Sequence, residues 1–398
     1  MRHLHLTVAG FALAGAFASP AIAQGGAPQD TAPDPIRNMV ARLDLERYKT
    51  TIKGLTQFGD RRQGTDRNRA AIDWIEAHLT SYGCPTERIK YEYNPAPNTG
   101  GGRGRGNTGL AQGGGRPRGV KTPTGVNTDP MKQPDEKLRA LNMQPMTPGP
   151  REAVYCTKVG VAHPEEMYII SGHMDGHGWG EAANDDGSGA ALVMELARIF
   201  SGPDVQTERT IRFALWNNEE TGSQAARAYI SQRQDRQGKE DPVGSGKYPE
   251  PKWLGMIQHD MMLFDHGAPR ADGTMSKEQR PEADVNVEFQ VNSKQAAESQ
   301  KLAWVLEVAN EKYASDYPAA VGSHMTNTDS GPFIDLIAAV SLRENDRGVH
   351  IGSGWDPQWH QPTDVFSTYT DADFRLGLNA AQTTLAAIAQ LAGASIKK

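Results

Sequence analysis

The stretch SGHMDGHGWGEAANDDGSG, residues 171–189, joins two apolar runs and concentrates charged side chains between them. It holds two His, three Asp, one Glu and six Gly. The preceding run MYIISG, residues 167–172, is short and apolar like a buried strand, whereas DGSGAALVMELARIFSG, residues 186–202, has the apolar spacing of a helix. Acids and histidines therefore gather where a strand ends and a helix begins, which is where open α/β sheets bind ligands.

Strand-like and helix-like segments alternate along most of the chain. The predicted strands are residues 87–94, 153–159, 167–172, 210–216, 253–260, 285–292 and 337–344, and the predicted helices are residues 70–83, 186–202, 221–233, 298–314 and 372–393. This alternation predicts an α/β fold with a mostly parallel central β-sheet sandwiched by helices.

Residues 95–150 interrupt the pattern and are rich in Gly, Pro, Asn, Thr and Gln. Within them, residues 99–122 contain five basic side chains and no acidic one. Such a segment buries too little apolar surface to offset its ordering entropy, so we expect a disordered insertion in a single domain spanning residues 35–396. An RNA-binding run is the weaker alternative. Deleting residues 100–145 is accordingly expected to leave the rest of the protein intact.

The N-terminal residues 1–23 have the layout of a signal peptide. Arg2 precedes an apolar run at residues 6–18, shorter than the ~20 residues that a membrane span needs, and an A-x-A cleavage motif ends at Ala23. A buried or membrane-anchoring helix is the alternative. We therefore expect cleavage, a flexible leader at residues 24–34, and an exported, periplasmic or secreted protein with no membrane span in its mature chain.

The formal net charge of -6 gives no reason to expect nucleic acid or an anionic membrane as a partner. Cys84 and Cys156 are the only cysteines, too few for a thiolate metal site. After export they could form one disulfide, because the predicted strands at 87–94 and 153–159 could pair as a hairpin across the insertion. Two free thiols remain the alternative, and the oligomeric state stays open.

Side chains that commonly bind metals follow four of the predicted strands, and one more opens the first helix after them. They are His173, Asp175, Glu219, Glu220, Asp260 and His360, with Asp185 at the helix start. Imidazole and carboxylate donors suit zinc. If Asp185 bridges, one ion takes His173, Asp185 and Asp260, and the other takes Asp185, Glu220 and His360. Two such ions ~3.5–4 Å apart would share a water and lower its pKa.

Glu219 stands beside a predicted ligand without being needed as one. A carboxylate in that place can take a proton from the water and pass it to a leaving amine, so Glu219 is the predicted general base.

The motifs HMD, ANDDGSG, NNEETGS, QHDM, TDSGPF and WHQPTDVF occur in an order and spacing that resemble the dizinc metallopeptidase family. That family includes bacterial leucyl aminopeptidases, glutamate carboxypeptidase II and glutaminyl cyclases, and the resemblance runs from about residue 40 to about residue 395. It implies the same five zinc ligands (His173, Asp185, Glu220, Asp260 and His360), Glu219 as general base, and Asp175 as the acid that orients His173.

Some residues depart from the family pattern or stay open. His259 precedes Asp260, and Ser330 stands where many members carry His or Tyr. His177 is interpreted as a loop histidine. Asp329 and Asp364 are candidates for supporting the ligands.

The predicted function is that of an exported two-zinc exopeptidase acting on a peptide substrate. A carboxypeptidase would need a cation for the terminal carboxylate, and Arg343 is the candidate. Because acids neighbour Arg343, we favour an aminopeptidase, whose carboxylates hold a free α-ammonium. A carboxypeptidase, a glutaminyl cyclase and a non-catalytic binding relative are the alternatives.

Overall fold

The computed structural model describes residues 34–93, 125–270, 272, 274–280, 283–325, 327–344 and 356–397. The chain divides into two compact units, Met1–Asp34 and Pro35–Lys398, and the fold described below is that of the second. The predicted signal peptide and nearly all of the predicted leader lie outside the described residues. Within the described ranges, no helix has the length and apolar content that crossing a membrane requires.

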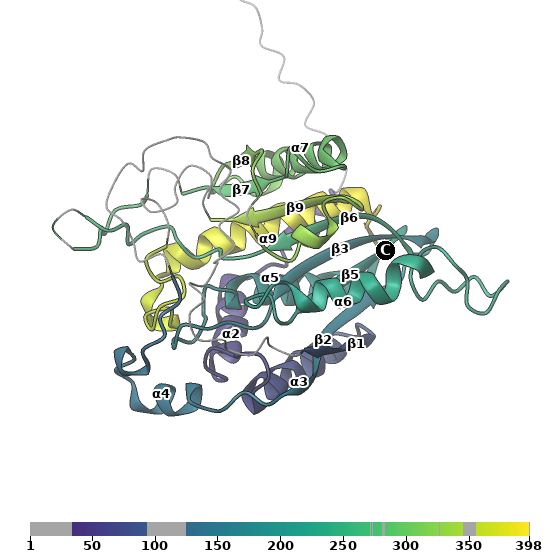
Figure 1. Cartoon of the computed structure of the whole chain (residues 1–398). Coiled ribbons are helices and arrows are strands. Elements are labelled where there is room, and N and C mark those ends of the chain that lie inside the picture. The colour runs from purple at the N-terminus through teal and green to yellow at the C-terminus, as the bar shows by residue number, and fades with distance from the viewer. Residues whose placement is uncertain are drawn as a thin grey trace, which may run out of the picture. The chain divides into compact units, whose positions relative to one another are not determined.

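Helices and strands alternate along the second unit, as the sequence predicts (Figure 1). The helices are α1 (Pro35–Val40), α2 (Leu45–Thr56), α3 (Asp66–Ser81), α4 (Glu136–Asn142), α5 (Gly187–Phe200), α6 (Gln224–Arg233), α7 (Ala296–Tyr313) and α9 (Asp371–Leu391), with short 3-10 turns at η1 (Pro130–Lys132), η2 (Gln234–Arg236), η3 (Gly331–Phe333) and η4 (Phe366–Thr368). The strands are β1 (Thr86–Tyr93), β2 (Gly149–Lys158), β3 (His163–His173), β4 (Val205–Gln206), β5 (Arg209–Trp216), β6 (Lys252–His259), β7 (Val285–Glu288), β8 (Ala319–Gly322), β9 (Ala338–Arg343) and β10 (Ser395–Ile396).

Eight of these strands form one sheet in the order β1-β2-β5-β3-β6-β9-β7-β8. The centre is parallel, since β3 pairs in parallel with β5 and β6, and β6 pairs in parallel with β9. Antiparallel pairing is found between β1 and β2, between β2 and β5, and between β7 and β9. The predicted α/β fold with a mostly parallel central sheet is therefore confirmed.

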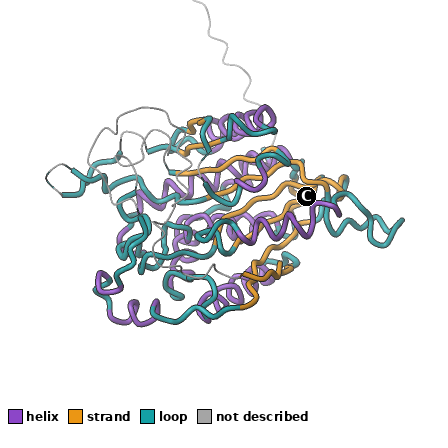
Figure 2. Tube along the Cα trace, viewed as in Figure 1, coloured by secondary structure: helices purple, strands orange, loops and turns teal. Residues whose placement is uncertain are grey.

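The alternation of side chains along β5 explains why helices cover both faces of the sheet. Ile211, Phe213 and Leu215 lie in one buried apolar cluster together with residues of α2, α3, α5, α7 and α9. Ala214 and Trp216 point the other way, into a second cluster that α6 and η3 cover. Strand residues alternate between faces, so an uninterrupted apolar strand requires cover on both sides. Helices accordingly lie on both sides of the strands in Figure 2.

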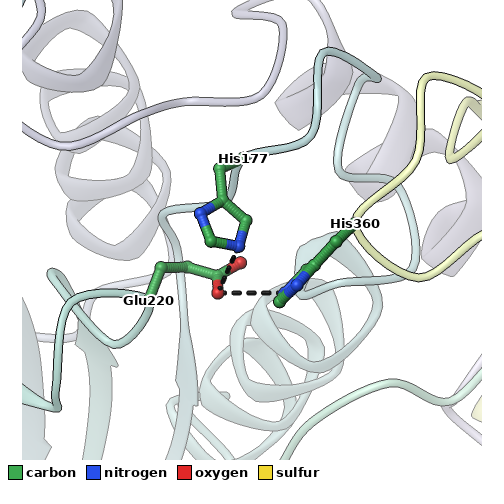
Figure 3. A group of neighbouring side chains, drawn as sticks. All are labelled: His177, Glu220 and His360. Carbon is green, nitrogen blue, oxygen red and sulfur yellow. Dashed lines mark ion pairs between the residues drawn. The ribbon is translucent and has the colours of Figure 1, made fainter. Parts of the chain in front are cut away.

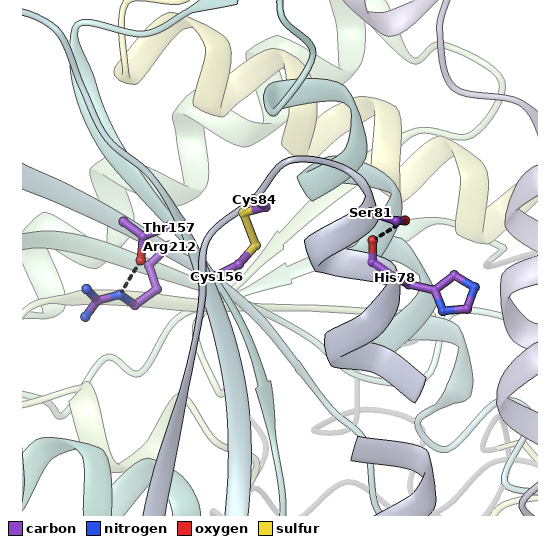
Figure 4. Close-up of a disulfide and its surroundings, with 6 residues drawn as sticks. All are labelled: His78, Ser81, Cys84, Cys156, Thr157 and Arg212. Carbon is purple, nitrogen blue, oxygen red and sulfur yellow. Dashed lines mark hydrogen bonds between the residues drawn. A yellow bond between two sulfur atoms is a disulfide. The ribbon is translucent and has the colours of Figure 1, made fainter. Parts of the chain in front are cut away.

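The two cysteines form a disulfide that joins the end of the α3 turn to β2 (Figure 4). Cys84 and Cys156 have Cα atoms 5.6 Å apart, and β1 and β2 pair as an antiparallel hairpin in which Thr86 is opposite Cys156. Of the two alternatives that the sequence leaves open, the structure has the bridge, and the predicted hairpin across the insertion is confirmed.

The predicted disorder of the insertion is wrong for residues 125–150, while residues 94–124 lie outside the described part of the chain. Asp135 caps α4 by accepting hydrogen bonds from the amides of Lys137 and Leu138. The side chain of Asn142 is buried and donates to the carbonyl of Gly180 over 2.8 Å. Caps and buried amide contacts, rather than apolar area, order this segment, and composition alone does not reveal them.

Candidate metal centre

The junction between β3 and α5 is held by one carboxylate and by two glycines that pack closely. Asp186 accepts hydrogen bonds from the amide of Gly189 at 2.8 Å and from the amide of His173 at 2.9 Å. A Cβ added to Gly172 would lie 2.8 Å from the carbonyl carbon of Gly189, so neither position leaves room for a side chain. The glycines therefore let the helix N-terminus approach the strand end, where His173 is the last strand residue.

A first cluster of metal-type donors surrounds the ring of His173. Its Nε2 atom lies 3.2 Å from Oδ1 of Asp185 and 3.7 Å from Oδ1 of Asp260. All three side chains are buried, and their donor atoms lie within 4.8 Å of one another. The structure thus brings together the three residues that the sequence assigns to one ion.

A second cluster lies around Glu220, which follows β5 (Figure 3). Oε2 of Glu220 lies 3.0 Å from Nε2 of His360 and 2.9 Å from Nε2 of His177. Glu220 and His360 belong to the second predicted ligand set. His177 does not, and the interpretation of His177 as an ordinary loop histidine missed its place in this cluster.

Asp185 contacts both clusters through different oxygens. Its Oδ1 atom faces His173, as described above, and its Oδ2 atom lies 2.9 Å from Nε2 of His360. A carboxylate that turns one oxygen to each cluster has the arrangement expected of a bridging ligand between two cations.

The donor atoms around Glu220 fit a cation. Oε1 of Glu220 and Nε2 of His177 are buried and have no hydrogen-bond partner among the described residues. Burial by itself would lower the pKa of His360, but the carboxylates of Glu220 and Asp185 outweigh it and raise that pKa to about 9. A proton on His360 therefore balances the neighbouring carboxylates, and a cation would replace that proton.

Glu219 and Asp175 lie beside the clusters. The amide of Glu219 donates to Oδ1 of Asp175 over 3.0 Å, so the two residues are coupled through the backbone. Burial raises the pKa of the Glu219 carboxyl well above its usual value and raises the pKa of Asp175 to about 7. A buried carboxylate with a raised pKa can exchange protons near neutral pH.

The sequence predicts that the carboxylate of Asp175 orients His173, but the structure shows a different contact. Nδ1 of His173 lies 2.9 Å from the backbone carbonyl of Asp175, whereas the nearest carboxylate oxygen of Asp175 is 3.8 Å away. The ring is thus oriented mainly by a main-chain acceptor.

Arg343 is buried and donates a hydrogen bond to Oδ2 of Asp260. The other oxygen of Asp260, Oδ1, faces His173. Arg343 therefore neutralises and orients a predicted ligand. The Nη2 atom of this candidate clamp is thus already occupied by a predicted ligand.

Sequence reasoning missed Arg61, which organises the loop between the clusters. Its fully buried guanidinium donates to the carbonyls of Met174 at 2.7 Å, Glu181 at 2.8 Å and Ala182 at 2.8 Å. The signal in the sequence was its position beside the acid Asp60 in the motif FGDRRQGTD, but nothing there indicates a partner more than 100 residues away.

Asp364, which the sequence leaves open, supports the bridging residue. Its carboxylate accepts hydrogen bonds from the amides of Asn184 at 2.8 Å and Asp185 at 3.1 Å, and from the hydroxyl of Tyr369 at 3.0 Å. The motif WHQPTD thus provides both a cluster residue, His360, and the acid that fixes Asp185.

A cavity of about 230 Å³ opens beside the second cluster. It is lined by Arg62, Gln63, Tyr93, Met146, Asp175, Gly176, His177, Glu220 and Thr221. The cavity therefore shares His177 and Glu220 with the second cluster, and its wall combines apolar and polar side chains with one arginine, Arg62.

Comparison with known proteins gives a family and a fold. The model of peptidase family M28 matches residues 154–384, more than half of the chain and all of the clustered side chains. Carboxypeptidase Q of Xenopus laevis is 38% identical over 71 residues, which are 18% of this chain and 15% of that protein. The match thus spans only a small part of that curated relative.

Solved structures resemble the chain over nearly its whole length. A zinc aminopeptidase from Bacillus subtilis has a TM-score of 0.57 at 14% identity, covering 89% of this chain and 96% of that one. The glutaminyl cyclase of Porphyromonas gingivalis has a TM-score of 0.55 at 15% identity, covering 88% and 99%. At these identities the likeness establishes the fold, whereas the family match rests on the sequence. The chain belongs to peptidase family M28.

Proposed function

We propose that the chain is an exported two-zinc exopeptidase that removes N-terminal residues from peptides. The observation that carries this proposal is the position of Asp185, whose two oxygens face two separate donor clusters. A single-ion site would not need a carboxylate shared in this way.

The ligands of the first ion are His173, Asp185 and Asp260, and those of the second include Asp185, Glu220 and His360. When bound, zinc supplies a polarised carbonyl and a water with a lowered pKa. Imidazole and carboxylate donors without thiolates fit zinc in this setting.

Glu219 moves the proton in the proposed reaction. Its carboxylate takes a proton from the attacking water and delivers it to the nitrogen of the leaving amine. Burial raises the pKa of the Glu219 carboxyl well above its usual value, which favours its taking up the proton of the water. Asp175 holds the backbone of Glu219 in place through the amide hydrogen bond.

Recognition of a free α-ammonium is favoured by the surplus of carboxylates. Asp329 is buried, and neither of its carboxylate oxygens has a hydrogen-bond partner among the described residues. Arg343, the candidate clamp for a terminal carboxylate, is already engaged by Asp260.

Two blocked peptides test the proposal. One has a free N-terminus and an amidated C-terminus, and the other is N-acetylated with a free C-terminus. We expect the protein to cleave only the first, one residue from its N-terminus, with the products identified by mass. Cleavage of the acetylated peptide alone would reject the aminopeptidase.

A carboxypeptidase is the second candidate, and one observation favours it. Arg62 is half-buried in the wall of the cavity, its guanidinium lies 5.8 Å from the Trp179 ring centroid, and no described carboxylate forms an ion pair with it. If this candidate holds, Arg62→Gln will abolish cleavage of the acetylated peptide, and Arg62→Lys will restore part of it.

Two further alternatives are separated by simple measurements. A glutaminyl cyclase would release ammonia from a peptide with N-terminal Gln, without adding water, and is expected to carry one zinc. A non-catalytic relative would bind metal and turn over none of these peptides. A metal count of two with a hydrolysed product supports the exopeptidase over both.

Export is part of the proposal and has its own test. The N-terminal sequence of the protein recovered from the periplasm or medium of an expressing bacterium is expected to begin at Gln24. Recovery of only the unprocessed chain from the cells would contradict it.

A further inference from the structure

His177 reaches the second cluster from the loop that follows β3. Its ring is perpendicular to that of His360, with centroids 4.1 Å apart and an interplanar angle of 89°. Figure 3 shows Nε2 of His177 directed toward the Glu220 carboxylate, on which His360 also converges. The three donor atoms lie within 4.8 Å of one another.

The contact between His177 and Glu220 is not an ordinary hydrogen bond. The two atoms, Nε2 and Oε2, are 2.9 Å apart, and yet Nε2 of His177 is buried without a partner in hydrogen-bond geometry among the described residues. Two imidazole nitrogens that converge on one carboxylate within 4.8 Å of one another have the arrangement of ligands around a common ion.

The backbone around His177 is shaped to hold the ring there. Gly178 has a φ of 98°, and a Cβ at that position would lie 2.4 Å from the carbonyl carbon of His360. A Cβ on Gly176 would lie 2.5 Å from the Cβ of Ala182. The sequence Gly-His-Gly thus packs the loop against the residue that carries the other imidazole, which a freely solvated loop histidine would not require.

We propose that His177 is a fourth protein ligand of the ion held by Asp185, Glu220 and His360. This inference rests on the two-zinc site proposed above and deepens it. Zinc sites with four protein ligands are closed, whereas catalytic sites keep a position for water or substrate.

The two ions would therefore differ in role. Asp185, Glu220, His360 and His177 would surround the second ion with four protein ligands, and we expect this ion to bind first and more tightly. His173, Asp185 and Asp260 would leave a position on the first ion for water or substrate.

The experiment compares the wild type with His177→Ala and His177→Gln, and uses His163→Ala as a matched control. His163 begins β3, and its side chain is 47% exposed. Metal-free protein is titrated with zinc against a competing chelator, and the binding constants of both steps are measured. The cobalt-substituted proteins are compared by the hyperfine-shifted imidazole signals in their proton NMR spectra. Unfolding of the metal-free forms verifies that each variant folds.

We expect both His177 variants to weaken the tighter binding step by more than about tenfold, since even residues that only orient ligands cost 10–100-fold in metal affinity. They should also lack one set of shifted imidazole signals. His163→Ala should match the wild type in both measurements. A folded His177 variant that binds both ions with wild-type affinity and keeps every shifted signal would overturn the inference. Wild-type protein that takes up no zinc would instead reject the proposed function itself.

Discussion

The backbone amide of Asn127 donates a hydrogen bond to the carbonyl of His360, with 3.0 Å between nitrogen and oxygen. A residue from the Gly- and Pro-rich segment thus contacts the main chain of a predicted metal ligand. Gln133 adds to this, because its amide nitrogen donates to the carbonyls of Trp179 at 2.8 Å and Pro362 at 2.9 Å. Residues 125–150 therefore help to hold the loops that carry the metal-type side chains.

Replacing two parts of the Gly- and Pro-rich segment should consequently have different effects on zinc binding. Replacing residues 100–120 with a short Gly-Ser linker is expected to leave the affinity for zinc unchanged. Replacing residues 126–145 in the same way removes Asn127, Gln133 and Asn142, and should weaken zinc binding and lower the melting temperature. Zinc titration and thermal unfolding measure both effects. Equal behaviour of the two variants would contradict the role of residues 125–150 in holding these loops.

Substituting Glu219 and Glu220 separately distinguishes the proposed general base from the proposed metal ligand. Glu219→Gln removes the carboxylate that accepts the proton, so kcat should fall by at least about 10²-fold while both metals are retained. Glu220→Gln removes a donor that contacts two imidazoles, and should lower the metal content instead. Metal analysis and peptide hydrolysis on the same samples give both readings. A Glu219→Gln protein with two metals and wild-type turnover would be incompatible with the assignment.

The close packing at the start of α5 predicts an intolerant glycine. In Gly189→Ala the new Cβ would lie 2.4 Å from Oδ1 of Asp186 and 2.6 Å from the carbonyl oxygen of His259. We expect a loss of about 1–3 kcal/mol in the free energy of unfolding, as for other overpacked sites. Gly331→Ala is the control, because no atom lies within 4 Å of a Cβ built there. Urea unfolding should show a lower free energy of unfolding for Gly189→Ala than for Gly331→Ala. Equal free energies of unfolding would refute the steric argument.

The disulfide should stabilise the fold mainly by restricting the unfolded chain. It joins residues 72 positions apart, and a loop of that size corresponds to about 4 kcal/mol in the chain-entropy account. The double variant Cys84→Ser with Cys156→Ser is therefore expected to lose stability by roughly that amount while retaining zinc. Denaturant unfolding of the oxidised wild type, the reduced wild type and the variant measures it. A variant as stable as the oxidised wild type would show that the bridge contributes nothing.

The sequence predicts the sheet and the first cluster well, because both depend on short-range signals. Apolar runs such as residues 210–216 identify buried strands, and the carboxyl ends of parallel strands meet at one edge. His173 and Asp260 lie at such ends and Asp185 lies at the start of the helix that follows the same strand as His173, so their proximity follows from the topology.

Other parts of the site depend on contacts between distant segments, which composition and periodicity do not encode. Arg61 binds carbonyls that are far away in the sequence, and Gln133 contacts two loops from a segment that appears unstructured by composition. His177 shows the same limit. Its spacing after β3 does not reveal which way the loop turns, and that turn depends on the glycines packed against Ala182 and His360.

Because the β1–β2 hairpin and its disulfide fix both ends of the segment between them, the length of that segment can change without altering the sheet. Eight residue pairs between β1 and β2, together with the covalent bridge, fix the positions at which the chain leaves and re-enters the sheet. Insertions or losses between Tyr93 and Gly125 therefore change neither the register of the sheet nor the spacing of the metal-type side chains. This segment is a place where the chain can acquire new sequence, such as a recognition epitope or a processing site, while the rest of the protein stays under its existing constraints.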